Sequence, residues 1–182
     1  TLTDAEARQA LRIAPTDTRH RLDLSGLRTV EFIVDGFMRN GLTVIAGAPG
    51  VGKTSLIVPL AAVVAHLVPS TLRPALRRKV VYASEDCEQA ADVLYGIAKN
   101  VPGAASADEF NKWFTLLPSR RLTPEKLAKL IASIVETHTV EQNGYPVRPL
   151  IVLDTSNANI ELENENDNSQ VGRAIAAIKE NL

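Results

Sequence analysis

The stretch Gly41 to Ser55, which reads GLTVIAGAPGVGKTS, decides the fold that we expect for this chain. Residues 47–54 within it match the pattern G-x-x-x-x-G-K-[ST] at every fixed position. The apolar, β-branched run before the pattern, Leu42 to Ala46, predicts a buried strand, and the apolar run after it, Ser55 to Val68, predicts a buried helix. A strand, this loop and a helix are the context that a phosphate-binding loop requires. The alternative is a chance glycine turn between a strand and a helix.

The residue types of the loop explain how it would hold a nucleotide. Glycines reach backbone angles that other residues avoid, so successive N–H groups can turn inward around a phosphate, and the helix start adds unpaired N–H donors. We expect Lys53 to act in catalysis by reaching the β- and γ-phosphates of ATP, and the Thr54 hydroxyl to hold Mg²⁺. The predicted ATP-binding residues are Gly47, Ala48, Pro49, Gly50, Val51, Gly52, Lys53, Thr54 and Ser55.

Length and composition are those of one ordinary globular domain. The chain has 182 residues, of which 45% are hydrophobic and 23% are charged, and its net charge is −1. Without a basic excess, any nucleic-acid contact must be local or arise from assembly. The single cysteine, Cys87, excludes an internal disulfide framework. The longest apolar stretch, Leu56 to Val68, is too short to span a bilayer, so we expect a cytoplasmic protein without a membrane contact.

The order of the expected elements indicates an α/β domain. Residues 1–28 predict an N-terminal arm or linker, and residues 29–182 predict the P-loop domain. Strands are expected at 29–34, 42–46, 80–83, 113–117 and 150–153, with helical stripes at 55–68, 90–98, 127–135 and 171–182 and loops at 102–108 and 141–148. This alternation predicts a mostly parallel sheet flanked by helices, with the ligand at the carboxyl ends of the strands. Pro59 should kink or shift its helix.

Two acidic residues stand at predicted strand ends. The unbroken apolar run Leu150 to Leu153 predicts a central strand covered on both faces, and Asp154 at its end is expected to bind Mg²⁺ through a water. The alternative for Asp154 is a strand-end aspartate that caps a turn. Glu85 follows the strand 80–83, where a carboxylate could orient the attacking water or accept its proton. Asp86 either competes for this role or caps the next helix.

The position of the acidic residues also separates classes of P-loop protein. In the AAA+ class a glutamate usually follows the metal-binding aspartate directly, whereas here Thr155 does, which disfavours that class. The RecA-like class places its glutamate at the end of the strand after the P-loop helix. Glu85 occupies that place, so we assign it the catalytic role by analogy of position.

Three segments of the chain resemble RepA-like replicative helicases and the related AAA-domain ATPases of plasmids and prophages. The first runs from Val34 to Ser55. The second, Tyr82 to Asp86, is similar to their strand-end S-x-E-D, and Asp154-Thr155 with Glu165 to Asn168 resembles their D-T…E-N-D/N signature. The resemblance covers about Val34 to Leu182. It implies a RecA-like P-loop NTPase core, ring-shaped hexamers and ATP-driven motion on DNA.

The resemblance also implies partners and further site residues. Glu165, Asn166 and Asp167 would contact Mg²⁺-bound water or a neighbouring subunit, whereas the residues alone indicate an acidic surface loop. Because the chain begins at Thr1 and stops at Leu182 in a predicted helix, we expect a C-terminally truncated fragment. Single-stranded DNA and the arginine or lysine that completes a neighbour's site would then involve parts beyond residue 182.

Two functions follow as expectations. The first is the ATP-binding and ATP-hydrolysing domain of a RepA-like DNA helicase or translocase, which uses ATP and Mg²⁺ and assembles as a hexamer. The alternative is a regulatory or loader RecA-like ATPase of a mobile element that does not unwind DNA. Stimulation of ATP hydrolysis by DNA separates the two.

Overall fold

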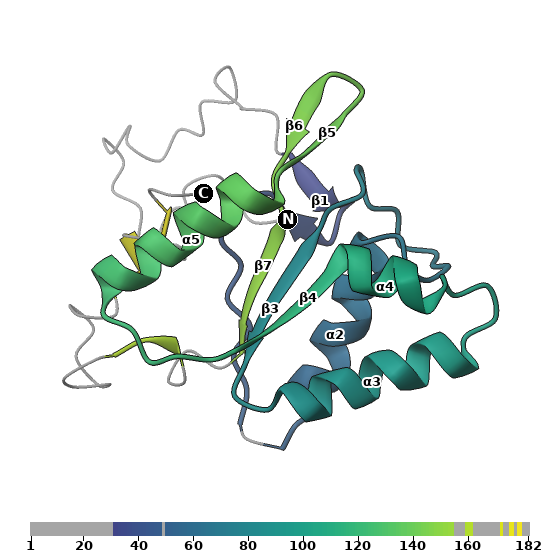
Figure 1. The fold of residues 1–182 in the computed structure, drawn as a ribbon, viewed down its shortest axis with the longest axis horizontal. Coiled ribbons are helices and arrows are strands. Elements are labelled where there is room, and N and C mark those ends of the chain that lie inside the picture. Colours follow the sequence, from purple (N-terminus) through teal and green to yellow (C-terminus); the bar gives the residue numbers. More distant parts are fainter. Residues whose placement is uncertain are drawn as a thin grey trace, which may run out of the picture. The chain divides into compact units, whose positions relative to one another are not determined.

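The computed structural model describes residues 31–48, 50–154, 159–161, 172, 175–176 and 178–179. Contacts within the chain delimit Glu31–Leu182 as one compact unit. The predicted arm or linker, residues 1–28, lies outside the described residues. Elements run in the order β1 (Phe32–Val34), β2 (Met38–Arg39), α2 (Lys53–Val64), β3 (Val80–Ser84), α3 (Cys87–Asn100), α4 (Ala107–Trp113), β4 (Phe114–Pro118), α5 (Pro124–His138), β5 (Val140–Gln142), β6 (Tyr145–Val147) and β7 (Leu150–Asp154) (Figure 1).

A parallel three-stranded sheet in the order β4-β3-β7 forms the centre of this unit. Both neighbours pair with β3 in parallel, and the register aligns Val80 with Phe114 on one side and with Leu150 on the other. Parallel neighbours need crossover connections, and the helices between these strands provide them. The predicted α/β class, a parallel sheet flanked by helices as in a P-loop NTPase core, is therefore confirmed.

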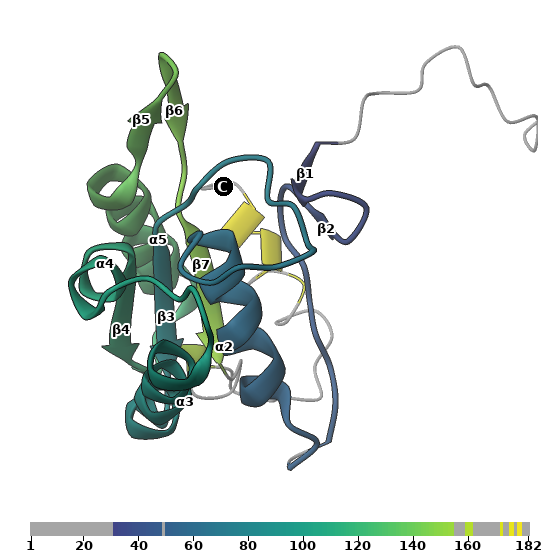
Figure 2. The same ribbon diagram turned by 90° about the vertical axis from the view of Figure 1, so that its right-hand side faces the viewer.

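Apolar side chains cover both faces of the sheet. One cluster joins Val58 and Ala61 of α2 to Tyr82 of β3 and Phe114 of β4, with half-buried residues of α3 packed against it. A second cluster joins Leu127 and Ile131 of α5 to half-buried residues of β7. Successive strand residues point to opposite faces, so α2 and α3 cover one face and α5 covers the other (Figures 1 and 2). This layering places the start of α2 beside the carboxyl ends of the strands.

One predicted strand is absent, and another has a different place in the sheet than expected. Residues 42–46 form no strand, and they are exposed, with 72% of Val44 open to solvent. Figure 2 draws the chain between β2 and α2 as an open connection that is not part of the sheet. An apolar run becomes a strand only where a sheet edge is in reach, and sequence pattern does not carry that information. The run Leu150 to Leu153 does form β7, but β3 is the central strand and β7 is at the edge of the described sheet.

A helix cap and a hairpin turn each follow from the types of a few neighbouring residues. Thr123 caps α5 by accepting a hydrogen bond from the N–H of Lys126, with Pro124 in the first turn, and both residue types are favoured at these positions. The loop predicted at 141–148 is instead the β5–β6 hairpin. Its turn residues Asn143 and Gly144 both have positive φ, and an Asn-Gly pair is the strongest short-range signal for such a turn.

Helix boundaries differ slightly from the expected ones. α2 begins at Lys53 and ends at Val64, and it runs through Pro59. α4 begins at Ala107, inside the loop predicted at 102–108, and Ser106 caps it. None of the described helices has the length and apolar character that crossing a membrane requires.

Candidate nucleotide site

The candidate site lies where β3, β7 and the start of α2 meet. The parallel register pairs Ser84 with Asp154, so both strands end at the same level of the sheet. The backbone continues this alignment, because the N–H of Glu85 donates to the carbonyl of Asp154 over 3.2 Å. A crevice outside the carboxyl ends of parallel strands is where α/β proteins bind their ligands.

Two glycines of the loop adopt the conformation that their residue type allows. Gly50 has φ +79° and Gly52 has φ +85°, and Gly52 is the residue that caps α2. Gly47 has no positive φ, so the expectation of a special backbone angle there is not met. It is short of space instead: an added Cβ would lie 3.0 Å from the Val51 side chain. Pro49 lies outside the described residues.

Lys53 folds back over the loop that precedes it. Its ammonium donates hydrogen bonds to the carbonyls of Gly47 at 2.8 Å and Ala48 at 3.0 Å. The neighbouring side chains of Val51 and Ser55 are exposed. The ammonium is therefore held at the loop, at the start of α2, where the helix offers unpaired N–H donors and the positive end of its dipole. Phosphate oxygens could replace the two carbonyls as partners of this cation.

Thr54 and Asp154 are joined although 100 residues separate them. The Thr54 hydroxyl donates to Oδ2 of Asp154 over 2.9 Å. A hydroxyl and a carboxylate are oxygen ligands of the kind that Mg²⁺ prefers. Beside a candidate phosphate-binding loop these two residues fit a Mg²⁺ site, which Thr54 would hold through its hydroxyl and Asp154 through its carboxylate. Among the described residues, His, Cys, Asp and Glu do not gather in threes as a metal site, so Mg²⁺ would also need ligands from the nucleotide and water.

Tyr82 is a residue that sequence reasoning did not assign to the site. Its hydroxyl donates to the same Oδ2 of Asp154 over 2.7 Å, and the residue is fully buried. Burial first, and then the hydrogen bond to Asp154, raise the pKa of the Tyr82 hydroxyl well above its ordinary value. The group therefore remains a proton donor at neutral pH. The available signal was a tyrosine inside a strand of apolar residues, since a buried tyrosine hydroxyl needs a partner.

The structure separates the roles of Glu85 and Asp86. The Asp86 carboxylate accepts a hydrogen bond from the N–H of Gln89 over 2.8 Å and so caps α3. Glu85 follows the end of β3 with its side chain exposed. Of the two neighbours, Asp86 is the one whose carboxylate is used in a helix cap, and the catalytic role of Glu85 stays a prediction. Glu165, Asn166 and Asp167 lie outside the described residues.

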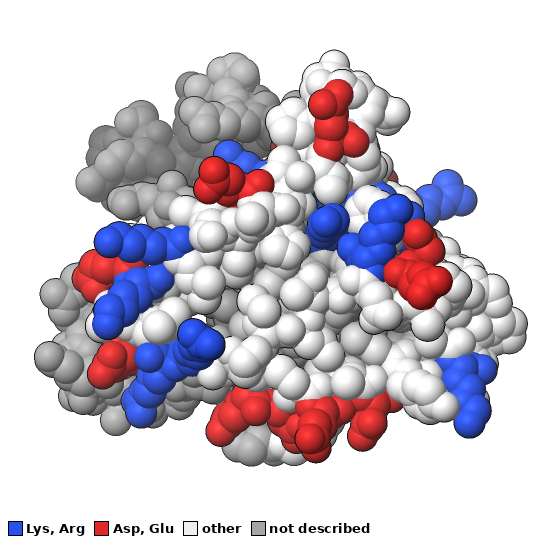
Figure 3. Space-filling model, in the orientation of Figure 1, with Lys and Arg blue, Asp and Glu red and all other residues white. Residues whose placement is uncertain are grey.

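Charge is unevenly distributed around the site. Figure 3 shows acidic side chains gathered near the start of α3, where Glu85, Asp86 and Glu88 are exposed. Basic side chains also lie over α5 and the segment before it, with acidic side chains between them. The exposed basic residues of that stretch are Arg120, Arg121, Lys126 and Lys129. The chain is nearly neutral overall, so this basic surface is a local feature.

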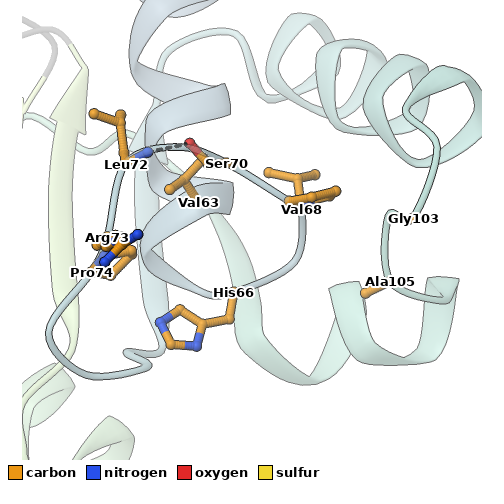
Figure 4. Close-up of a pocket in the computed structure, with 10 residues that line it drawn as sticks. Val63, His66, Val68, Ser70, Leu72, Arg73, Pro74, Gly103 and Ala105 are labelled. Atoms are coloured by element: carbon orange, nitrogen blue, oxygen red, sulfur yellow. Dashed lines mark hydrogen bonds between the residues drawn. The ribbon is translucent and has the colours of Figure 1, made fainter.

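A surface pocket elsewhere in the structure is separate from the candidate site. It has a volume of about 470 Å³ and surrounds the C-terminal end of α2, with His66, Ser70 and Arg73 among its lining residues (Figure 4). Lys53 and Thr54 are at the opposite end of the same helix. Burial, and then the nearby Arg77, lower the pKa of His66, so its ring is neutral at pH 7. The pocket has none of the P-loop residues.

Comparison with known proteins identifies a family. A model of the family described as AAA domain matches residues 7–181. No curated protein and no solved structure matches the chain. The family match covers almost the whole sequence, including the P-loop and the strand that ends in Asp154.

Proposed function

The chain belongs to the AAA-domain family and is an ATPase domain of that family, and we propose that it is the ATP-hydrolysing domain of a RepA-like DNA helicase or translocase. The hydrogen bond between Thr54 and Asp154 is the observation that carries the nucleotide-binding part. This hydrogen bond joins the end of the loop that would bind the phosphates to the carboxylate that would bind a water molecule of the Mg²⁺ shell. Residues 29–182 are the proposed ATPase domain.

The proposed mechanism gives each residue one task. The N–H groups of the loop and of the first turn of α2 bind the phosphates, and Lys53 exchanges the carbonyls of Gly47 and Ala48 for oxygens of the β- and γ-phosphates. Thr54 and Asp154 would hold Mg²⁺. When bound, this ion would supply the positive charge that stabilises the negative phosphoryl oxygens. Glu85 orients a water for in-line attack on the γ-phosphate and accepts its proton.

The DNA-dependent part of the proposal rests on two supports. One is the resemblance of the P-loop region, the strand-end S-x-E-D and the E-N-D/N stretch to RepA-like helicases. The other is the basic surface over α5, which offers positive charge for phosphates on a chain whose net charge is −1. A hexamer and an arginine supplied by a neighbouring subunit belong to the same proposal. The alternative remains a regulatory or loader ATPase that does not unwind DNA.

One experiment tests the proposal as a whole. ATP hydrolysis is measured with and without single-stranded DNA, together with the mass in solution in the presence of Mg²⁺-ATP. Strong stimulation by DNA and a hexameric mass support the helicase or translocase. If the rate of ATP hydrolysis is the same with and without DNA and the protein is a monomer or dimer, the regulatory ATPase is supported. A chain that binds no nucleotide would contradict both.

A further inference from the structure

We propose that Tyr82 is a positioning residue for the metal-binding carboxylate of Asp154, an inference that rests on the proposed function. Two donors meet at one oxygen of that carboxylate. Tyr82 approaches Oδ2 at 2.7 Å and Thr54 approaches it at 2.9 Å. Within the described part of the chain, no hydrogen bond reaches the other oxygen, Oδ1, which is left for the water shell of a metal.

The sheet register explains why Tyr82 can reach Asp154. Tyr82 pairs with Val152 and Ser84 pairs with Asp154, so Tyr82 and Asp154 are diagonal neighbours two residues apart along the strands. Residues two apart in a strand point to the same face, which here is the face covered by α2. A long side chain is needed to cross this diagonal, and tyrosine supplies both the length and a terminal donor.

The ring of Tyr82 is fixed by the core. It is fully buried, lies in the same apolar cluster as Val58 of α2, and stacks on Phe114 with ring centroids 6.1 Å apart. A donor whose ring is locked by packing keeps its place without any ligand. Thr54 differs from Tyr82 in that its hydroxyl oxygen is also a proposed ligand of the metal. Tyr82 therefore holds the rotamer of Asp154 while Thr54 binds the metal, as outer-shell partners do in other metal sites.

The test removes a single atom. Tyr82→Phe keeps the ring and its stacking and deletes only the hydroxyl. The measurement is the free Mg²⁺ concentration that half-maximally tightens the binding of a fluorescent ADP analogue. We expect this concentration to rise about 10- to 100-fold in Tyr82→Phe. Binding of the same analogue in EDTA should be unchanged, because the loop and Lys53 are untouched.

Matched controls separate this role from a structural one. Tyr95→Phe and Tyr145→Phe remove hydroxyls from tyrosines that are 67% and 70% exposed, and they should leave the Mg²⁺ dependence as it is. In an Asp154→Asn background, Tyr82→Phe should have no further effect on Mg²⁺, because the carboxylate it positions is gone. If the Tyr82→Phe variant folds and keeps the wild-type Mg²⁺ dependence, this inference is wrong but the proposed function still stands. A wild type that binds neither nucleotide nor metal would overturn the proposed function with it.

A second measurement does not depend on the folding of Tyr82→Phe. The chain has three tyrosines, so wild-type protein labelled with 3-fluorotyrosine gives three ¹⁹F resonances, which the Tyr95→Phe and Tyr145→Phe variants assign. We expect the Tyr82 resonance to shift when Mg²⁺ is added to the ADP-bound protein. A Tyr82 resonance whose chemical shift does not change when Mg²⁺ is added would contradict the inference.

Discussion

The hydroxyl of Thr54, in the first turn of α2, donates a 2.9 Å hydrogen bond to the carboxylate of Asp154, the last residue of β7. This contact ties the start of α2, directly after the candidate phosphate-binding loop, to the end of the sheet. A site whose groups are already in place loses less entropy when it binds than one that must first be assembled. The predictions below follow from this arrangement and from the charges around it.

Replacing Lys53 with alanine should weaken nucleotide binding. The ammonium is the side-chain cation held at the loop, and a hydrogen bond to a charged group contributes about 1.5–3 kcal/mol, which corresponds to a loss of roughly 10- to 100-fold in affinity. Calorimetric titration with Mg²⁺-ADP measures the effect. Lys99→Ala, at the last turn of α3, removes an exposed lysine away from the loop and serves as the control. Equal affinities of the two variants would count against the whole site.

Glu85→Gln should spare Mg²⁺-ATP binding and reduce turnover by about 10²- to 10⁴-fold, which is the usual contribution of a general base. Asp86→Ala should show the opposite pattern. Its carboxylate caps α3, so the variant should lose about 1 kcal/mol of stability while it retains most turnover. Single-turnover hydrolysis and chemical unfolding measure the two quantities. Loss of turnover in Asp86→Ala but not in Glu85→Gln would move the base to Asp86.

Acid should weaken one ion pair that holds α4. Arg77 donates to the backbone of Ala65 at 2.8 Å and to Glu109 at 2.7 Å, and its guanidinium lies 3.8 Å from the ring centre of Trp113. The hydrogen bond from Arg77 is the main reason that the pKa of Glu109 lies below its usual 4.5.

A lowered pKa in the folded state means that the stabilisation is present above the ordinary pKa and is lost as the pH falls through the folded value. Wild type should therefore melt at a higher temperature than Glu109→Gln at pH 7, and the difference should shrink as the pH drops below 4.5. Thermal unfolding across this range measures it. Glu136→Gln, an exposed residue of α5, is the control. A difference that is the same at every pH would contradict the assignment.

Reversing charge on α5 should reduce any stimulation of hydrolysis by DNA. Lys126 and Lys129 are exposed on the basic surface, and each lost phosphate contact flattens the salt dependence of binding by about one unit of slope. The double variant Lys126→Glu/Lys129→Glu should lose DNA stimulation and keep its basal hydrolysis. Lys99→Glu tests whether a change of net charge alone has the same effect. Stimulation that survives in the double variant would place the DNA contact elsewhere.

Several parts of this structure could be predicted because their causes are local. The P-loop match, the capping pair Thr123-Pro124 and the run that becomes β3 each depend on residues close together in the chain. The Asn143-Gly144 pair is a local signal for the β5–β6 hairpin, although the composition of the surrounding segment predicts a loop. The run Leu42 to Ala46 carried a strand pattern, but a strand also needs a partner edge, and no local pattern shows whether one is in reach.

The sequence by itself determined the G-x-x-x-x-G-K-[ST] pattern at residues 47–54, the helix after it, and acidic residues at two strand ends. Only the tertiary structure decided that β3 is central, that Thr54 meets Asp154, and that Tyr82 shares the same carboxylate oxygen from 72 residues away. The physical reason is register. A shift of one residue in the pairing of β3 with β7 would turn Tyr82 and Asp154 to opposite faces of the sheet, and that register is set by the packing of the whole core.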